Sequence, residues 1–162
     1  MLARLATTVL LAAVWLNASA DDHQHDHHSM HLAASQAWSR AMPPTAPTGA
    51  VYFTLRNPGD TADRLVGVKT PRAEKAELHA HVHDGDLMRM EHVEGVDVPA
   101  GGEVQFKPGG YHVMLFNLSE PLVAGDRFPL TLIFRDGGEV QTEVTIRDQA
   151  PEGDTGAAHS HH

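Results

Sequence analysis

The feature that most constrains this 162-residue chain is a side-chain pattern that repeats every two residues. In the clearest stretch, 139–147, valine, threonine and isoleucine alternate with polar and charged side chains. The stretch 51–56 alternates in the same way. Successive side chains of a strand point to opposite faces, whereas a helix repeats every 3.6 residues. The pattern therefore predicts strands that are buried on one face.

Further short apolar segments are separated by sequences rich in glycine, proline, asparagine and aspartate. We expect additional strands at 64–69, 75–82, 86–93, 103–107, 111–118 and 127–135. The turn sequences lie at 57–60, 84–85, 99–102, 108–110 and 136–138. No segment has the pattern of an amphipathic helix, so the sequence predicts an all-β, antiparallel β-sandwich.

The two ends of the chain differ in composition from the middle. Residues 1–20 combine Arg4, an apolar run and an Ala-Ser-Ala cleavage pattern. We expect a signal peptide there, and an exported, soluble, periplasmic protein that begins at Asp21 without a membrane span. The histidine-rich segment 21–36 and the histidine-containing tail 149–162 can bury little apolar surface, so we expect both to be flexible. One domain is expected at 37–148.

Charge and cysteine content exclude several functions. Twelve Lys+Arg against 21 Asp+Glu give a formal net charge of -9, and no basic patch stands out, so nucleic acid is not an expected partner. An acidic balance suits a protein that collects cations, and equally suits any secreted domain. The absence of cysteine means that the sequence has no disulfide framework and no blue-copper centre, which requires a thiolate.

The sequence contains four potential ligands for a soft metal ion: His79, Met90, His112 and Met114. In a strand, His112 and Met114 share one face. A hairpin with its turn at 84–85 brings His79 near Met90. Thioether sulfur is soft and neutral and prefers Cu(I) to Zn, Mg or Ca. The set therefore predicts a Cu(I) site.

Each of these residues taken alone has a more ordinary explanation. Methionine commonly fills gaps in a core, and histidine is commonly a surface residue. Only the spacing of all four in a chain without cysteine favours copper. We expect Met88 to be a neighbour of the site, and His81, His83 and His92 to be solvated or accessory.

The spacing His, ten residues, Met, twenty-one residues, His, one residue, Met resembles the motif of the PCu(A)C-type periplasmic copper chaperones. Further segments similar to the family follow in family order, at 37–44, 49–57, 63–67, 77–79, 99–102, 107–114 and 129–132. The resemblance implies a cupredoxin-like sandwich that binds one Cu(I). It also implies delivery to the CuA site of cytochrome c oxidase, beside other copper-handling assembly proteins.

Two other functions share these ligands. A copper-sequestering or resistance protein would bind the metal in the same way and keep it. A copper redox enzyme or electron carrier is disfavoured, because no nucleophile–base pair or paired carboxylates stand out and cysteine is absent. We therefore expect a carrier and not an enzyme.

The flanks offer a second metal site. With Asp21 as the first residue, its amine, two backbone amides and the His23 imidazole can surround Cu(II) in the square plane that this ion favours. His159, His161 and His162 at the other end resemble the metal-binding extensions of some family members. The simpler alternative is that both flanks keep the protein soluble and bind metal weakly.

The first prediction concerns the mature N-terminus. If cleavage leaves Asp21 first, Cu(II) bound by Asp21, Asp22 and His23 should give a square-planar electron paramagnetic resonance spectrum with nitrogen hyperfine structure. One extra residue ahead of Asp21 moves His23 out of third position and should abolish the signal, whereas His25→Ala should preserve it. N-terminal sequencing of the exported protein establishes the cleavage point. The signal surviving an added residue would contradict this site.

Overall fold

The computed structural model describes residues 31–152, which form ten strands and no helix. Short polar turns connect the strands, as the distribution of glycine, proline and aspartate predicts. The strands are β1 (Ala33–Arg40), β2 (Thr48–Arg56), β3 (Asp63–Lys69), β4 (Ala73–Asp84), β5 (Leu87–His92), β6 (Val96–Val98), β7 (Glu103–Phe106), β8 (His112–Leu118), β9 (Arg127–Phe134) and β10 (Glu139–Arg147).

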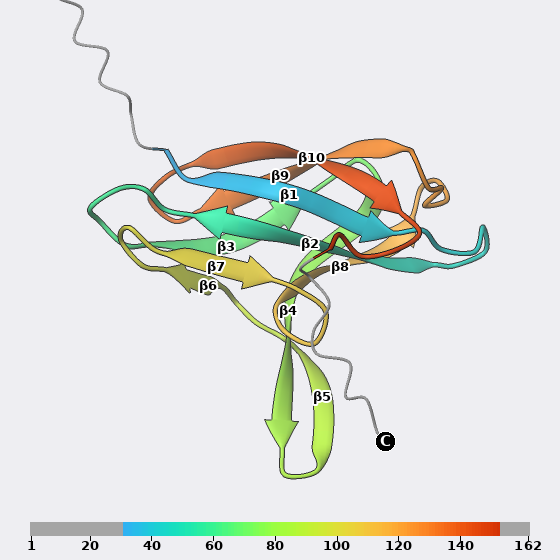
Figure 1. Ribbon diagram of the computed structural model, residues 1–162, viewed down its shortest axis with the longest axis horizontal. Helices are drawn as coiled ribbons and strands as arrows, with labels where there is room; N and C mark the ends of the chain where they lie inside the picture. Colours follow the sequence, from blue (N-terminus) through green and yellow to red (C-terminus); the bar gives the residue numbers. More distant parts are fainter. Residues whose placement is uncertain (1–30, 153–162) are drawn as a thin grey trace, which may run out of the picture.

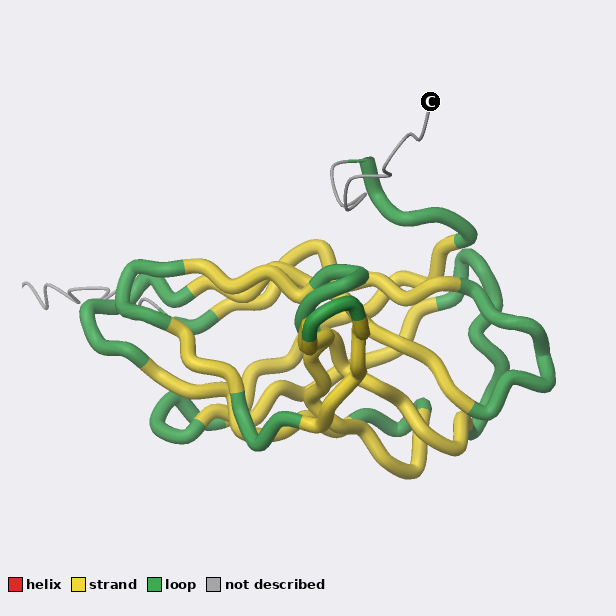
Figure 2. The backbone as a smooth tube through the Cα atoms, turned by 90° about the horizontal axis from the view of Figure 1, so that it is seen from below, coloured by secondary structure: helices red, strands yellow, loops and turns green. Residues whose placement is uncertain are grey.

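Hydrogen bonds link all ten strands into one sheet that folds back on itself. The order along the sheet is β5-β4-β8-β2-β1-β10-β9-β3-β6, and β7 pairs with β2. Figure 1 and Figure 2 show the two halves of this sheet stacked as layers. The predicted all-β sandwich is therefore confirmed.

One strand pair differs from the antiparallel expectation. β1 and β10 are parallel, with Trp38 opposite Thr145, while the other strand pairs of the described chain are antiparallel. No turn joins these two strands directly, so the path of the whole intervening chain sets their relative direction. Alternation within each strand carries no information about that direction.

The first strand also begins earlier than the expected domain boundary at residue 37. Ala33 pairs with Arg56 and Ser35 with Thr54, and the register then shifts before Trp38. Gln36 lies at this bulge with a φ of 54°. A bulge inserts an extra residue and interrupts alternation, which is why 33–36 does not resemble a strand in the sequence.

The core lies between the two layers. Its side chains are the alternate apolar positions that the sequence pattern marks, drawn from strands of both halves, and they include Val51, Phe53, Leu55, Leu65, Leu78, Val113, Leu115, Leu130, Leu132, Val144 and Ile146. A single contiguous cluster of this kind is what one domain requires. The strands are thus held in register by burial on their inner faces.

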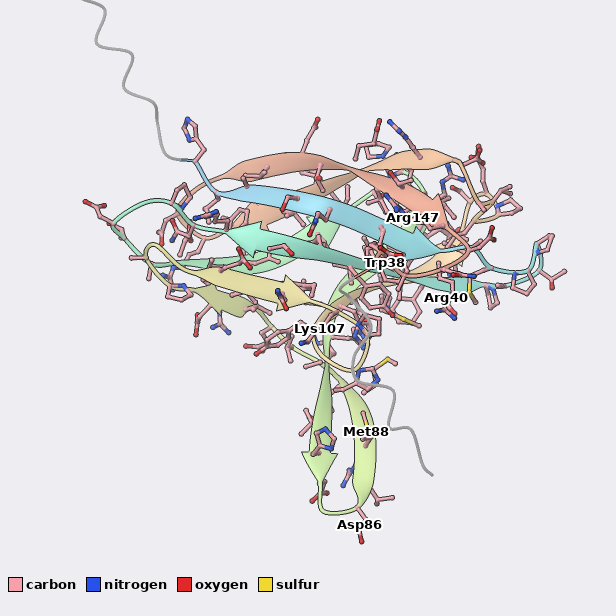
Figure 3. The ribbon with its side chains drawn as sticks, viewed as in Figure 1. Trp38, Arg40, Asp86, Met88, Lys107 and Arg147 are labelled. Carbon is pink, nitrogen blue, oxygen red and sulfur yellow. The ribbon has the colours of Figure 1, made fainter. Side chains whose placement is uncertain are left out.

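The hairpin of β4 and β5 projects away from the two layers (Figure 1). All six residues of β5 are exposed, and β5 pairs only with β4 at the end of the sheet order. Figure 3 shows Met88 and Asp86 far out along this hairpin, away from Trp38 in the sandwich. The hairpin is therefore an arm attached to a packed body.

Several sequence expectations lie outside the described residues: the signal peptide 1–20, most of the segment 21–36 and most of the tail 149–162. Between residues 31 and 152, there is no helix with the length and apolar character needed to cross a membrane.

The second prediction concerns the core. Leu132 in β9 is fully buried, so Leu132→Ala should lower the free energy of unfolding by about 2–5 kcal/mol through lost burial and a residual cavity. Val123→Ala is the control, because Val123 is 52% exposed and its truncation should change stability by roughly 0.5 kcal/mol or less. Urea denaturation followed by circular dichroism measures both. Equal losses in the two variants would contradict the assignment of Leu132 to the core.

Candidate metal centre

Three neighbouring strands, β5, β4 and β8, place the predicted ligands on one face of the sheet. In β8, Val113 and Leu115 are fully buried in the core, so His112 and Met114 point to the opposite face. His79 of β4 lies directly opposite His112. The same alternation that builds the core therefore gathers the donors outside it.

His112 is the most deeply placed of these residues, with 2% of its surface exposed. It follows the turn at Gly109, whose φ of 81° is a conformation that glycine adopts without strain. The Nδ1 atom of His112 is 3.2 Å from the carbonyl oxygen of Gly110. Because a carbonyl only accepts, Nδ1 carries the proton and donates it. The Nε2 lone pair is thereby left free, and Nε2 is buried without a partner.

Burial also governs the charge of His112. It lowers the pKa of this imidazole below its ordinary value, and the bond to Gly110 only partly opposes that effect. The neutral form is the one that binds a metal ion. His112 therefore keeps a usable lone pair at pH values where an exposed imidazole becomes protonated.

His79 is oriented by a carboxylate. Its Nε2 atom lies 3.0 Å from Oε2 of Glu77, two residues back on the same face of β4. An ionised carboxylate only accepts hydrogen bonds, so Nε2–H donates and Nδ1 bears the lone pair. That Nδ1 atom is buried and has no partner. Metal-binding histidines characteristically donate the second ring nitrogen to a carboxylate or a carbonyl, as His79 and His112 both do.

Glu77 is held in its ionised form. The hydrogen bond from His79 and then that from Lys75 lower the pKa of Glu77 to about 2. The Lys75 Nζ atom is 2.9 Å from its other oxygen, Oε1. A negative charge therefore lies beside the donor set without being a member of it.

A cavity of about 440 Å³ opens beside these strands, lined by Met90, His112 and Met114. His81 also lines it, whereas His79 does not. The ring centre of His79 is nevertheless only 5.8 Å from that of His112. The structure thus brings three predicted ligands around one cavity, and the fourth, His79, lies opposite His112 on β4 and outside the lining.

The opposite side of this cavity is formed by residues that the sequence did not single out. Trp38 and Tyr52 line it and contact each other with ring centres 4.9 Å apart. Met42 also lines it while packing against the core. These side chains make that side of the cavity largely apolar, and Arg40 and Thr48 also line it.

The register of the hairpin differs from the sequence expectation. A turn at 84–85 would set His79 opposite Met90. The observed turn is one residue later, at Gly85 and Asp86, and sets His81 opposite Met90 and His79 opposite His92. Moving a hairpin turn by one residue shifts the residue opposite any given position by two. His81 therefore lies opposite Met90, where a turn at 84–85 would have placed His79.

Other histidines and methionines near the site match the sequence interpretation. His83 and Met88 are exposed and lie opposite each other further along the hairpin. His92 is exposed, and its ring meets the His79 ring edge-on at 5.8 Å. Their exposure agrees with the expected accessory roles.

Within residues 31–152, no three His, Cys, Asp or Glu side chains are close enough together to hold one metal ion. The donors that accompany the imidazoles at this centre are the thioether sulfur atoms of Met90 and Met114, which line the cavity. Two imidazoles with thioether sulfur form a neutral, soft donor set, which suits Cu(I) better than Zn, Mg or Ca. The ligand set His79, Met90, His112 and Met114 stays a prediction that this geometry supports.

A second cavity, of about 560 Å³, is lined by Asp60, Asp63 and Asp136 among others. The buried carboxylate of Asp63 already accepts backbone N–H groups from Arg64, Asp136 and Gly137. Its charge is thus used to fix two loops, and this cavity has no comparable set of unpartnered donors. The predicted Cu(II) ligands of the flanks, Asp21, Asp22, His23, His159, His161 and His162, lie outside the described residues.

The third prediction concerns Glu77. Because its pKa lies at about 2 in the folded domain and near 4.5 ordinarily, its stabilising contribution is complete above pH 4.5 and is lost as the pH falls towards 2. His79→Phe should raise the pKa of Glu77 more than Lys75→Met does, since the bond from His79 has the larger effect. Carbon-13 NMR titration of the metal-free domain measures both. A Glu77 carboxyl that titrates near 4.5 in the unsubstituted protein would contradict this hydrogen-bond arrangement.

Comparisons with known proteins agree with this architecture. The protein Lxx21020 of Leifsonia xyli subsp. xyli is 32% identical over 120 residues, which cover 72% of this chain and 70% of that protein. The solution structure of CuI-DR1885 from Deinococcus radiodurans is 34% identical with a TM-score of 0.58, and covers 70% of this chain and 76% of its own. The apo PCuAC domain from PmoF1 is 29% identical with a TM-score of 0.61, and covers 74% of this chain and 94% of its own.

These structures confirm the cupredoxin-like sandwich that the family resemblance implies. The profile of the family described as LpqE-like matches residues 32–146, nearly the whole described domain. The chain belongs to this LpqE-like, PCuAC-type family.

Proposed function

We propose that this protein is a periplasmic copper chaperone that binds one Cu(I) through His79, Met90, His112 and Met114. The observation that carries the proposal is the pair of buried imidazole nitrogens, Nδ1 of His79 and Nε2 of His112, which have no protein partner. Buried polar atoms are nearly always hydrogen-bonded, so such atoms call for an explanation. A metal ion held with the adjacent thioethers supplies one.

The related structures support copper as the metal. The DR1885 structure is described as its Cu(I) form, and a PCuAC domain from PmoF2 has been solved with copper bound. DR1885 is 34% identical to this chain. Copper in this protein follows from that relationship together with the donor chemistry.

Delivery, as opposed to storage, is favoured by the exposure of one ligand. Met90 is 49% exposed on the projecting hairpin, while His112 is buried. An acceptor can therefore replace Met90 first and the inner ligands afterwards. Because all four donors are neutral, an acceptor with thiolates binds Cu(I) more tightly and draws it onward. The CuA site of cytochrome c oxidase is the acceptor that we propose, in direct contact or through another copper-handling assembly protein.

A carrier of this kind has no catalytic role. Copper sequestration for resistance is the alternative, and it shares the same ligands. The His-rich flanks would add Cu(II) binding or raise the local copper concentration in either case. The two functions differ only in whether bound copper is passed on.

The fourth prediction tests the ligand set. Met114→Leu should weaken Cu(I) binding by about tenfold or more, because it removes a soft donor and little volume. It should affect Cu(II) much less. Met88→Leu is the matched control, since Met88 is on the hairpin but outside the cavity. Anaerobic competition with a Cu(I) chelator and X-ray absorption measure affinity and sulfur ligation; unchanged Cu(I) affinity in Met114→Leu would refute the ligand set.

Delivery is tested with the Cu(I)-loaded protein and a soluble CuA domain in its reduced, metal-free form. Transfer should appear as the characteristic absorption of the assembled CuA site after oxidation. A gene deletion should lower oxidase activity at low copper. No transfer, with loss of copper tolerance at high copper as the deletion phenotype, would identify sequestration.

A further inference from the structure

His81 has the position of a ligand but is not one of the four motif residues. It lies directly opposite Met90 in the hairpin and lines the cavity together with Met90, His112 and Met114. His79, which the motif includes, is absent from the lining. The cavity therefore has its own histidine, supplied by the register of the hairpin.

The ring of His81 is aimed at this centre. Its Nδ1 atom is buried and has no hydrogen-bond partner, as is true of Nδ1 of His79 and Nε2 of His112. These are the three buried side-chain nitrogen or oxygen atoms of the described residues that lack a partner. Buried polar atoms are nearly always hydrogen-bonded, so an unpartnered ring nitrogen at a metal centre is a candidate ligand, as for His79 and His112.

The distance from His81 to His112 suits a shared ion. Their ring centres are 5.2 Å apart, closer than the 5.8 Å between His79 and His112. A metal ion about 2 Å from one nitrogen of each ring fits between rings at either separation. The Gly110 carbonyl oxygen accepts hydrogen bonds from both residues: from the His81 backbone N–H at 3.3 Å and from Nδ1 of His112 at 3.2 Å.

In the metal-free structure, the imidazoles of His79, His81 and His112 are not grouped around one point. No three His, Cys, Asp or Glu side chains in the described part of the chain are arranged to hold a single metal. An ion bound to His112 can thus take either His79 or His81 as its second imidazole. The alternatives place the ion between His112 and His79, or in the open cavity next to Met90.

We propose that His81 is a copper ligand, and that the centre has two overlapping positions that share His112. The two positions differ in the second imidazole: the inner position uses His79, as in the proposed ligand set, and the outer position uses His81, which lines the cavity with Met90 and Met114. One Cu(I) occupies one position at a time and moves between them by exchanging neutral ligands. This inference rests on the proposed copper function and deepens it, since the outer position is the one that an acceptor reaches.

The test is a set of asparagine variants of the full-length exported protein. His79→Asn and His81→Asn should each weaken Cu(I) binding by about tenfold or less, because the other position remains. The double variant should lose more than about 100-fold, which exceeds the two single effects combined. His79→Asn with His83→Asn is the matched control, because His83 lies two residues further along the same strand face but is exposed and outside the cavity.

A direct measurement accompanies these variants. Long-range nitrogen-15 NMR of the histidine rings in the unsubstituted protein should show the His81 Nδ1 signal shifting on addition of one equivalent of Cu(I), with His83 unchanged. Circular dichroism and thermal unfolding of each metal-free variant establish that it is folded. A His81 signal that does not move, or a double variant no weaker than His79→Asn, overturns the inference.

The same measurements separate this inference from the proposed function. His112→Asn removes the ligand common to both positions and should abolish tight Cu(I) binding. If it does so while His81→Asn and the double variant show no added effect, the chaperone site stands and His81 is not a ligand. If His112→Asn binds Cu(I) as well as the unsubstituted protein, the proposed function fails and the inference with it.

Discussion

The pleat of β8 is the constraint on which the metal centre depends. Val113 and Leu115 are fully buried between the layers, so His112 and Met114 must lie on the other face of the same strand. A shift of one residue in the register would carry the donors into the core and expose the apolar side chains. Hydrophobic burial therefore fixes the position of ligands that make no charged contact of their own. Burial of the alternate residues therefore orders the donors of β8 before a metal is bound.

The two histidines on the body of the domain are held more firmly than the methionine on the hairpin. Glu77 and the Gly110 carbonyl fix the tautomers of His79 and His112, so both lone pairs are oriented in advance. Met90 lies instead on β5, which pairs only with β4 and is exposed along its whole length. A strand with little buried surface opens locally at low cost. The centre thus combines two imidazoles of fixed orientation, His79 and His112, with the thioether of Met90 on an exposed strand. This arrangement suits a site that takes up an ion and releases it.

The sequence predicts most of this domain because alternation is a local property. The expected strand 64–69 is observed as Asp63–Lys69, and 127–135 as Arg127–Phe134. The three-residue strand β6 alternates buried, exposed, buried, but it is too short for that pattern to stand out in the sequence, and the bulge in β1 conceals its first residues. At the candidate site, spacing and donor chemistry identify four residues, but they do not reveal that His81 faces Met90. That pairing depends on whether the two turn residues are 84–85 or Gly85–Asp86. Asp-Gly is a favoured pair in two-residue hairpin turns, so the sequence alone is compatible with a turn at 84–85. Register across a hairpin is a property of the turn and not of the strands that it joins.

The charge balance of the centre explains how a weakly anchoring donor set can still accept a cation. None of the proposed ligands is charged, so bound Cu(I) would leave a net positive charge partly out of water, which is costly unless compensated. Glu77 supplies the compensation from behind His79, and its pKa of about 2 keeps it ionised throughout the physiological range. The carboxylate is engaged by His79 and Lys75, which leaves soft nitrogen and sulfur facing the cavity. An acceptor that brings thiolates offers the negative charge and the soft donor in the same atom. In the chaperone that we propose, the ion would therefore gain by leaving, while Glu77 keeps its contacts with His79 and Lys75.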